Sequence, residues 1–177
     1  VRRRPALLVL ILTSYTAAGT GFAYIAFLPA YVADVFDQGA IALGLLNAAV
    51  AVGAVTAALV GATIVDGARA WRVHTLAAAG FSLSLAGLAF APTFELALLL
   101  GVIVGAGENG FLTLNQALTM RFSEPDYYGR IQALLMLGFG LFGILALPSG
   151  ALADAIGIRE TLVVQAVVGS TLLFAIR

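Results

Sequence analysis

Residues 94–121 read FELALLLGVIVGAGENGFLTLNQALTMR, and this stretch decides the fold class. A helix that crosses a hydrocarbon core of about 30 Å needs about 20 mostly apolar residues. Residues 94–121 exceed this length, and their charges lie near the ends, at Glu95 and Arg121, with one exception in the middle, Glu108. The apolar residues do not alternate with polar ones as in a membrane-spanning strand. The stretch therefore predicts a transmembrane helix.

The composition of the whole chain supports the same interpretation. Of its 177 residues, 62% are hydrophobic and 10% are charged, whereas about 25% of the residues of a typical soluble domain are charged. The mean hydropathy is +1.05. So few charges cannot cover the surface of a soluble fold. We therefore exclude a soluble domain and expect the chain to lie in a lipid bilayer.

Six stretches have the length and polarity of a transmembrane helix, and short charged segments separate them. They predict an all-α membrane protein with a single six-helix transmembrane bundle and no soluble domain. The expected spans are residues 6–35, 41–65, 75–91, 94–121, 129–153 and 161–176.

The distribution of arginine predicts the orientation. The chain has nine acids and nine bases, all of the bases are Arg, and the net charge of zero gives no sign of a nucleic-acid partner. A cytoplasmic N-terminus places eight of the nine Arg on the cytoplasmic side and only Arg159 outside, as the positive-inside rule requires. We expect a multi-pass protein of the cytoplasmic (inner) membrane with both termini in the cytoplasm.

The chain has no Cys and a single His, His74, so we expect neither a thiolate metal site nor a Cys nucleophile. His74 is predicted to lie at the edge of a cytoplasmic loop, as an interfacial residue and not as a ligand. No nucleophile, metal cluster or second titratable group converges on Glu108 in the sequence. We therefore expect neither an enzyme nor a cofactor or metal site.

Small residues predict where the helices pack closely, because lipid supplies no hydrophobic drive for helix association. Ala49, Gly53, Ala57 and Gly61 recur at every fourth position of the second span. In the fourth span, Gly101 and Gly105 form a GxxxG motif. We expect all four glycines to serve helix packing and not ligand binding.

Two spans carry a polar stripe on one face. On a helical wheel, the stripe of the fourth span contains Gly101, Gly105, Glu108, Leu112, Asn115 and Thr119, with Gln116 beside it. The stripe of the first span contains Thr13, Thr16, Thr20, Tyr24 and Tyr31. The two spans are predicted to form walls of a polar cavity. For the threonines, a bond to the carbonyl one turn earlier in the same helix is the alternative.

Glu108 is the one charge placed at membrane depth. A carboxylate at the centre of a bilayer costs about 2.5–3.5 kcal/mol on insertion scales, so intramembrane acids are commonly functional. The functional hypothesis makes Glu108 a site for proton coupling or for a cationic substrate. The alternative is a protonated acid that bonds Asn109 or a helix carbonyl. No Arg, Lys or His of the sequence is expected at its depth.

The chain resembles a known family of transporters over its whole length, and residues 115–157 carry the matching motifs. A Gly-rich span that ends in Asn115 and Gln116 is followed by a loop of sequence PDYYGR at residues 125–130 and, after a Gly- and Pro-bearing helix, by GALADAIG at residues 150–157. These features resemble the major facilitator superfamily. The segment is most similar to the subgroup of the enterobactin exporter and the macrolide-efflux-like proteins.

The resemblance implies a fold and a function. It implies the C-terminal half of a twelve-helix carrier, built from two inverted three-helix repeats, whose first and fourth spans line the central cavity. It also implies a cytoplasmic gating loop that includes Asp126, Gly129 and Arg130. The implied activity is secondary active, proton-coupled efflux of a small molecule such as a drug or a siderophore, by alternating access.

This six-helix unit has two possible partners, and both give a carrier of the same structural class. One is a missing N-terminal half, which makes the chain a fragment. The other is a second copy of the chain, which makes it a self-contained carrier that works as a homodimer. A membrane scaffold without transport activity is the alternative from a different class.

Overall fold

The first predicted span is a helix that breaks twice in the computed structural model, which describes residues 5–64 and 67–176. An α-helix over Pro5–Thr16 (α1) leads into a π-helical turn over Ala17–Gly21 (η1). The chain then continues as α2 over Tyr24–Ala30 and as a second π-helical turn, η2, over Tyr31–Val35. Glycine destabilises the interior of a helix, and Gly19 and Gly21 lie at the first break. Pro29 removes a helix hydrogen bond shortly before the second break.

The rest of the described chain forms five long helices and one short turn. Their bounds are Ala40–Ala62 (α3), Gly67–Ala89 (α4), Phe94–Arg121 (α5), Pro125–Tyr127 (η3, a 3₁₀ turn), Tyr128–Ile156 (α6) and Ile158–Ala175 (α7). All regular structure in the described ranges is helical, so the predicted all-α class is confirmed.

The helix of the third span begins before the predicted span itself. The sequence suggested residue 75, but α4 begins at Gly67. The earlier residues Arg69 and Arg72 were assigned to a loop because of their charge, yet both are exposed on the first turns of the helix. A helix end that leaves the membrane accommodates such charges without ending.

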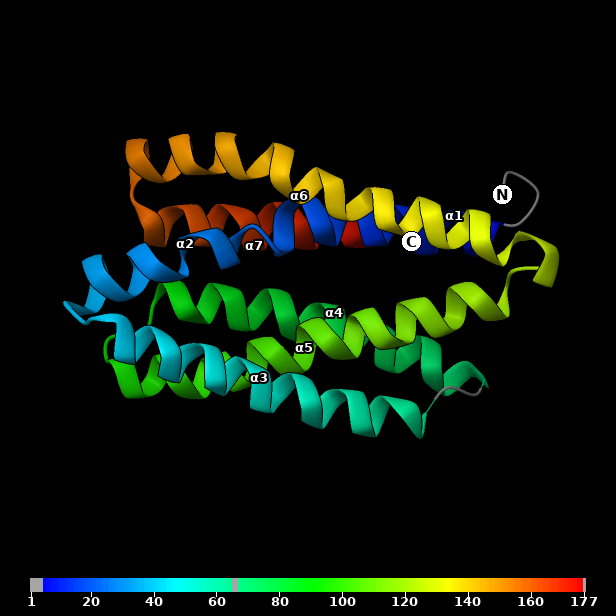
Figure 1. Cartoon of the computed structure of the whole chain (residues 1–177), viewed down its shortest axis with the longest axis horizontal. Coiled ribbons are helices and arrows are strands. Elements are labelled where there is room, and N and C mark those ends of the chain that lie inside the picture. Colours follow the sequence, from blue (N-terminus) through cyan, green and yellow to red (C-terminus); the bar gives the residue numbers. More distant parts are fainter. Residues whose placement is uncertain (1–4, 65–66, 177) are drawn as a thin grey trace.

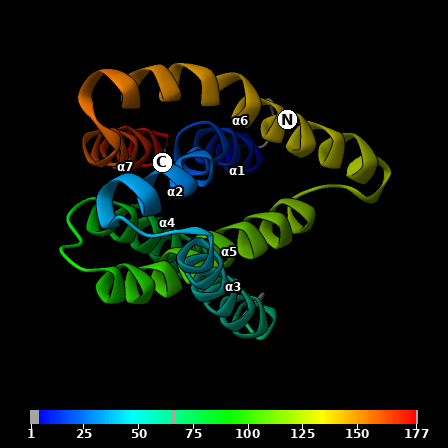
Figure 2. The same cartoon turned by 60° about the vertical axis from the view of Figure 1, so that its left-hand side comes forward.

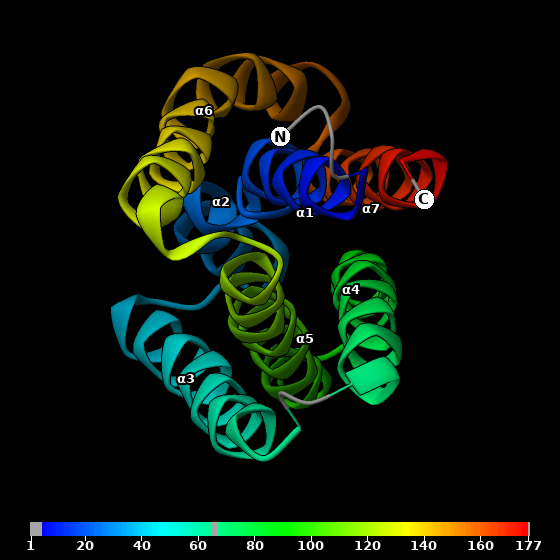
Figure 3. The ribbon, with the colours of Figure 1, turned by 90° about the vertical axis from the view of Figure 1, so that its right-hand side faces the viewer.

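The helices form two groups of three, counting the broken helix as one. The contacts show that α3 and α4 pack on α5, whereas α6 and α7 pack on the broken first helix. Viewed along the bundle in Figure 3, α1, α2, α6 and α7 lie in one group and α3, α4 and α5 in the other. The groups are also in contact with each other, because α1 contacts α5, α7 contacts α4 and α2 contacts α3. Figure 2 shows α3 and α6 on opposite sides of the molecule.

Capping and turn residues fix several helix ends. The hydroxyl of Thr93 accepts a hydrogen bond from the backbone N–H of Leu96 and caps α5. A single residue, Gly157, separates α6 from α7, and its φ of 101° is a conformation that glycine adopts readily. The long helices consequently run back and forth along the bundle, as Figure 1 shows.

Four helical stretches of the described chain are long and apolar enough to cross a membrane: Pro5–Val35, Ala40–Ala62, Phe94–Arg121 and Pro125–Ile156. The surface is apolar as well, with Ile41, Leu59 and Leu147 among the large side chains that are more than two-thirds exposed. These features support a membrane protein. The helices α4 and α7, which contain the remaining predicted spans, are not among these four stretches of the described residues.

Candidate functional site

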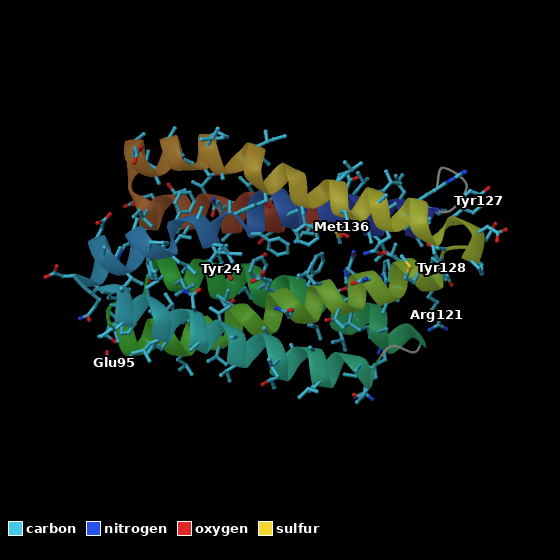
Figure 4. All side chains as sticks on the ribbon, viewed as in Figure 1. Tyr24, Glu95, Arg121, Tyr127, Tyr128 and Met136 are labelled. Atoms are coloured by element: carbon cyan, nitrogen blue, oxygen red, sulfur yellow. The ribbon has the colours of Figure 1, made fainter. Side chains whose placement is uncertain are left out.

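The centre of the bundle holds a hydrogen bond between the two helices that carry the polar stripes. The hydroxyl of Tyr24 donates to Oε2 of Glu108 over 2.7 Å. Tyr24 is the first residue of α2, just after the first break, and is almost fully buried, whereas Glu108 lies in the middle of the unbroken helix α5 and is partly buried. Figure 4 shows Tyr24 between one end of the bundle, marked by Glu95, and the other, marked by Arg121 and Tyr128.

Aromatic packing holds Tyr24 in this position. A Cβ atom at Gly107 would lie 2.7 Å from the backbone nitrogen of Phe81, so only glycine lets α4 approach α5 this closely. The Phe81 ring then packs edge-on against Tyr24 and Phe22, with centroid distances of 6.1 Å in both pairs. The sequence singled out neither Phe81 nor Gly107 for this role, because their contact depends on the tertiary packing of α4 on α5.

The other residues of the first stripe divide between two arrangements. The hydroxyl of Thr20 donates to the carbonyl oxygen of Thr16 over 2.8 Å, which is the own-helix bond that the alternative interpretation describes. Both residues are partly buried. Tyr31 reaches another helix instead, and its hydroxyl donates to the carbonyl oxygen of Leu88 in α4.

A second set of polar contacts lies nearer the C-terminal end of α5. We call it the Asn115 cluster, and it consists of Thr13, Ser14, His74 and Asn115. The Asn115 Nδ2 atom donates to Oγ of Ser14 over 2.7 Å, and its Oδ1 atom lies 3.1 Å from Nε2 of His74 and 3.4 Å from Oγ1 of Thr13. Asn115 is 2% exposed. The cluster therefore ties α5 to both α1 and α4.

The prediction that His74 lies at the edge of a loop is wrong. Because α4 begins at Gly67, His74 lies about two turns inside the helix and is 1% exposed. Its ring lies against Phe111, at a centroid distance of 4.8 Å, and against Trp71. Sequence reasoning missed His74 and Ser14 as partners of Asn115. An extension of the α4 helix through the two arginines could have indicated His74.

The remaining polar residues of the fourth span point in different directions. Thr119 is fully buried, and its hydroxyl donates to the carbonyl oxygen of Asn115 over 2.6 Å. Gln116 is exposed and lies outside the cluster. The stripe therefore brings Glu108, Asn115 and Thr119 towards the interior and leaves Gln116 on the surface.

The glycines of the second and fourth spans lie where α3 and α5 meet. A Cβ atom at Gly53 would collide with the carbonyl oxygen of Val102, and one at Gly105 would collide with the carbonyl oxygen of Val50. A Cβ atom at Gly101 would lie 3.0 Å from Leu46, and one at Gly61 would make ordinary contact with Thr113 at 3.4 Å. Two of the four positions thus bring backbone against backbone.

The predicted gating residues lie together in an exposed turn. Asp126 belongs to η3, and Gly129 and Arg130 belong to the first turn of α6. The guanidinium carbon of Arg130 lies 5.6 Å from the ring centroid of Tyr127, which is a cation–π arrangement. In residues 5–64 and 67–176, no group of three His, Cys, Asp or Glu side chains could hold a metal ion.

Comparison with known proteins assigns the family. The family model described as Major Facilitator Superfamily matches residues 1–177. The chain belongs to the major facilitator superfamily. No curated protein and no solved structure matches it in these comparisons.

Membership of the major facilitator superfamily confirms the predicted general class, a membrane transporter. The family is not one of enzymes. The subgroup suggested by the loop at residues 125–130, and the place of the chain within a longer carrier, stay predictions. So does the arrangement of this superfamily member as two inverted repeats.

Proposed function

We propose that this chain carries a small molecule out of the cytoplasm by alternating access, with Glu108 as the residue that takes up a proton or a cationic substrate. The Tyr24–Glu108 hydrogen bond supports this proposal most directly. The bond joins Glu108, the carboxyl that the sequence predicts at membrane depth, to the interrupted first helix. Intramembrane acids most often mark ion or substrate pathways.

The chemistry of the pair suits a residue that changes its charge. The hydrogen-bond partner of Glu108 is a phenol and not a cation, so the pair carries whatever charge the carboxyl carries. A hydrogen bond to a charged carboxylate is about twice as strong as one between neutral groups. Loss of the Glu108 proton would therefore tighten the bond to Tyr24, and arrival of a proton or a cationic substrate would loosen it.

The break in the first helix lets a change in the strength of the Tyr24–Glu108 bond move α2. Tyr24 begins α2, and residues 17–23 before it form the π-helical turn and the bend that follows. Interrupted helices concentrate motion at a few residues. A tight Tyr24–Glu108 bond fixes α2 to α5, and a loose bond lets α2 swing about residues 17–23. We propose that this swing opens and closes one side of the polar cavity that the first and fourth spans are predicted to line.

The proposal also covers the surroundings of this unit. All six predicted helices cross the membrane, including α4 and α7, and the unit rocks against a second six-helix unit. That unit is an N-terminal half or a second copy of this chain. Large exposed apolar side chains on α3 and α6, such as Val52 and Leu147, offer surface for lipid or for this partner. The substrate class is a drug-like or siderophore-like molecule, exchanged for protons.

The test compares Glu108→Gln with the unchanged protein in cells that express it. The probe is ethidium, a lipophilic fluorescent cation, and its efflux is followed at external pH values from 5.5 to 8. The proposal expects the variant to lose most of the efflux and all of its pH dependence. Glu95→Gln, which changes an exposed acid at the end of the bundle, is the control and is expected to behave like the unchanged protein.

Two results test the coupling role of Glu108 and the transport function of the protein separately. If Glu108→Gln keeps both the rate and the pH dependence of the unchanged protein, Glu108 has no coupling role. If the unchanged protein moves neither ethidium nor protons, a non-transporting scaffold gains support. Cross-linking in the membrane separates the two partner models, because only the homodimer predicts contact between two copies of this chain.

A further inference from the structure

A small cavity lies between four helices, apart from the Tyr24–Glu108 pair. It has a volume of about 10 Å³, and Thr13 of α1, Phe111 of α5 and a set of α4 and α7 residues surround it. The polar members of this set are His74, Thr75, Ser82 and Ser170. A cavity needs about 10–15 Å³ and two to four polar partners to hold one water molecule. The cavity meets both conditions.

The hydroxyl groups around the cavity all donate their hydrogen atoms elsewhere. Ser82 and Ser170 donate to the carbonyl oxygens of Ala78 and Ala166, over 3.1 and 2.6 Å. In the same way, Thr13 and Thr75 donate to carbonyl oxygens of their own helices, those of Leu10 and Trp71. Each of these hydroxyl oxygens keeps lone pairs with which it can accept a further hydrogen bond. A molecule that donates two hydrogen bonds and occupies about 10 Å³ is the complementary ligand.

The helices α4 and α7 carry most of the buried polar side chains outside the two polar stripes. Most of the buried polar side chains of the described chain come from these two helices, namely His74 and two serines of α4, together with Thr161 and Gln165 of α7. Gln165 is 6% exposed, and neither its Nε2 nor its Oε1 atom has a hydrogen-bond partner in the protein. An unsatisfied buried amide costs about 1–3 kcal/mol. A water molecule beside the Gln165 amide would remove this cost.

From these observations we infer that the cavity at Thr13, Ser82 and Ser170 binds one water molecule, which bridges α1 to α4 and α7. The water donates to hydroxyl oxygens of different helices. Bonds to water rearrange more easily than direct bonds between side chains, because the water can turn and exchange. The broken first helix thus has a contact with α4 and α7 that yields when it moves.

The experiment is X-ray hydroxyl-radical footprinting of the purified protein in lipid nanodiscs. Radiolysis produces radicals from bound water, so buried rings beside an internal water are oxidised and rings in dry regions are not. Phe111 lines the cavity and is 1% exposed, and Phe81, which is 3% exposed, does not line it. We expect Phe111 to be oxidised several-fold faster than Phe81. Equal slow rates for the two rings would overturn the inference.

Ser170→Val tests the position of the water, because the added methyl groups fill the cavity and remove one acceptor. The oxidation of Phe111 should then fall to the rate of Phe81. The matched control is Thr171→Val, which removes an exposed hydroxyl that also donates within its own helix, over 2.8 Å, and should leave the rate unchanged. Persistent oxidation of Phe111 in a folded Ser170→Val protein would place the water elsewhere and refute the site. Should Ser170→Val not fold, the contrast between Phe111 and Phe81 in the unchanged protein decides alone.

Discussion

Tyr24 and Glu108 are 84 residues apart in the sequence, and a hydrogen bond of 2.7 Å joins the phenol of one to the carboxyl of the other. One residue begins the helical segment that follows a break, and the other lies inside a helix without a break. The bond therefore connects the interrupted first helix to a helix without interruption. The predictions below test this connection and the packing around it.

Tyr24→Phe removes the hydroxyl and keeps the ring that packs on Phe81. A hydrogen bond to a charged group contributes about 1.5–3 kcal/mol, so the unfolding temperature should fall and the pH dependence of ethidium efflux should weaken. Tyr31→Phe is the control, since it removes a buried phenol that donates to the carbonyl oxygen of Leu88. It should lower the unfolding temperature but leave the pH profile unchanged. An unaltered pH profile in Tyr24→Phe would separate the hydroxyl from coupling.

Gly105→Ala should destabilise the contact between α3 and α5. The new methyl group collides with the carbonyl oxygen of Val50, and α3 must move away or the residue must strain. Overpacking of this kind typically costs about 1–3 kcal/mol. Gly140→Ala is the control, because no neighbouring atom lies within 4 Å of its added Cβ. Thermal unfolding in detergent measures both, and equal unfolding temperatures would show that α3 adapts freely.

Asn115→Leu should loosen the hold of α5 on α1 and α4. The substitution leaves the Ser14 hydroxyl and the His74 ring without the amide they contact, at a cost of about 1–3 kcal/mol for a buried polar group that loses its partner. The neighbouring change Gln116→Leu affects an exposed side chain and should alter stability by no more than about 0.5 kcal/mol. Chemical denaturation of the two variants gives the comparison. Equal effects would argue against a structural role of the Asn115 cluster.

Single cysteines test the orientation, and the chain offers a background without native Cys. Glu95→Cys lies at one end of the bundle and Asp126→Cys in the exposed turn at the other (Figure 4). A membrane-impermeant maleimide added to intact cells should label the first and not the second. In inverted vesicles, the pattern should reverse. Labelling of Asp126→Cys in intact cells would contradict a cytoplasmic position of this turn.

The sequence predicts α5 best. Its bounds, residues 94–121, agree with the helix Phe94–Arg121 because charges and a capping threonine mark both ends. The predicted polar walls also name both partners of the central hydrogen bond. The sequence could not show that Tyr24 pairs with Glu108, because that depends on the bend at residues 17–23 and on the close approach of α4 at Gly107.

Two residues show where local patterns fail. His74 follows Arg69 and Arg72, and these charges suggest a loop edge, yet the helix continues through them and places His74 inside the bundle. Thr20 lies on the predicted polar face, but the π-helical turn changes the angular spacing there and its hydroxyl bonds to Thr16. Tertiary contacts decide the position of His74, whereas the Thr20 bond is the own-helix alternative, which a helical wheel does not distinguish from a hydroxyl that faces a cavity.

The single-residue link at Gly157 affects how motion spreads. Two helices of 29 and 18 residues meet there with no loop between them, so the adjoining ends of α6 and α7 cannot separate. A displacement of α6 would pull the near end of α7, and α7 in turn packs on α4. The short link therefore transmits a movement of α6 to α7, and the contact of α7 with α4 transmits it to the other three-helix group.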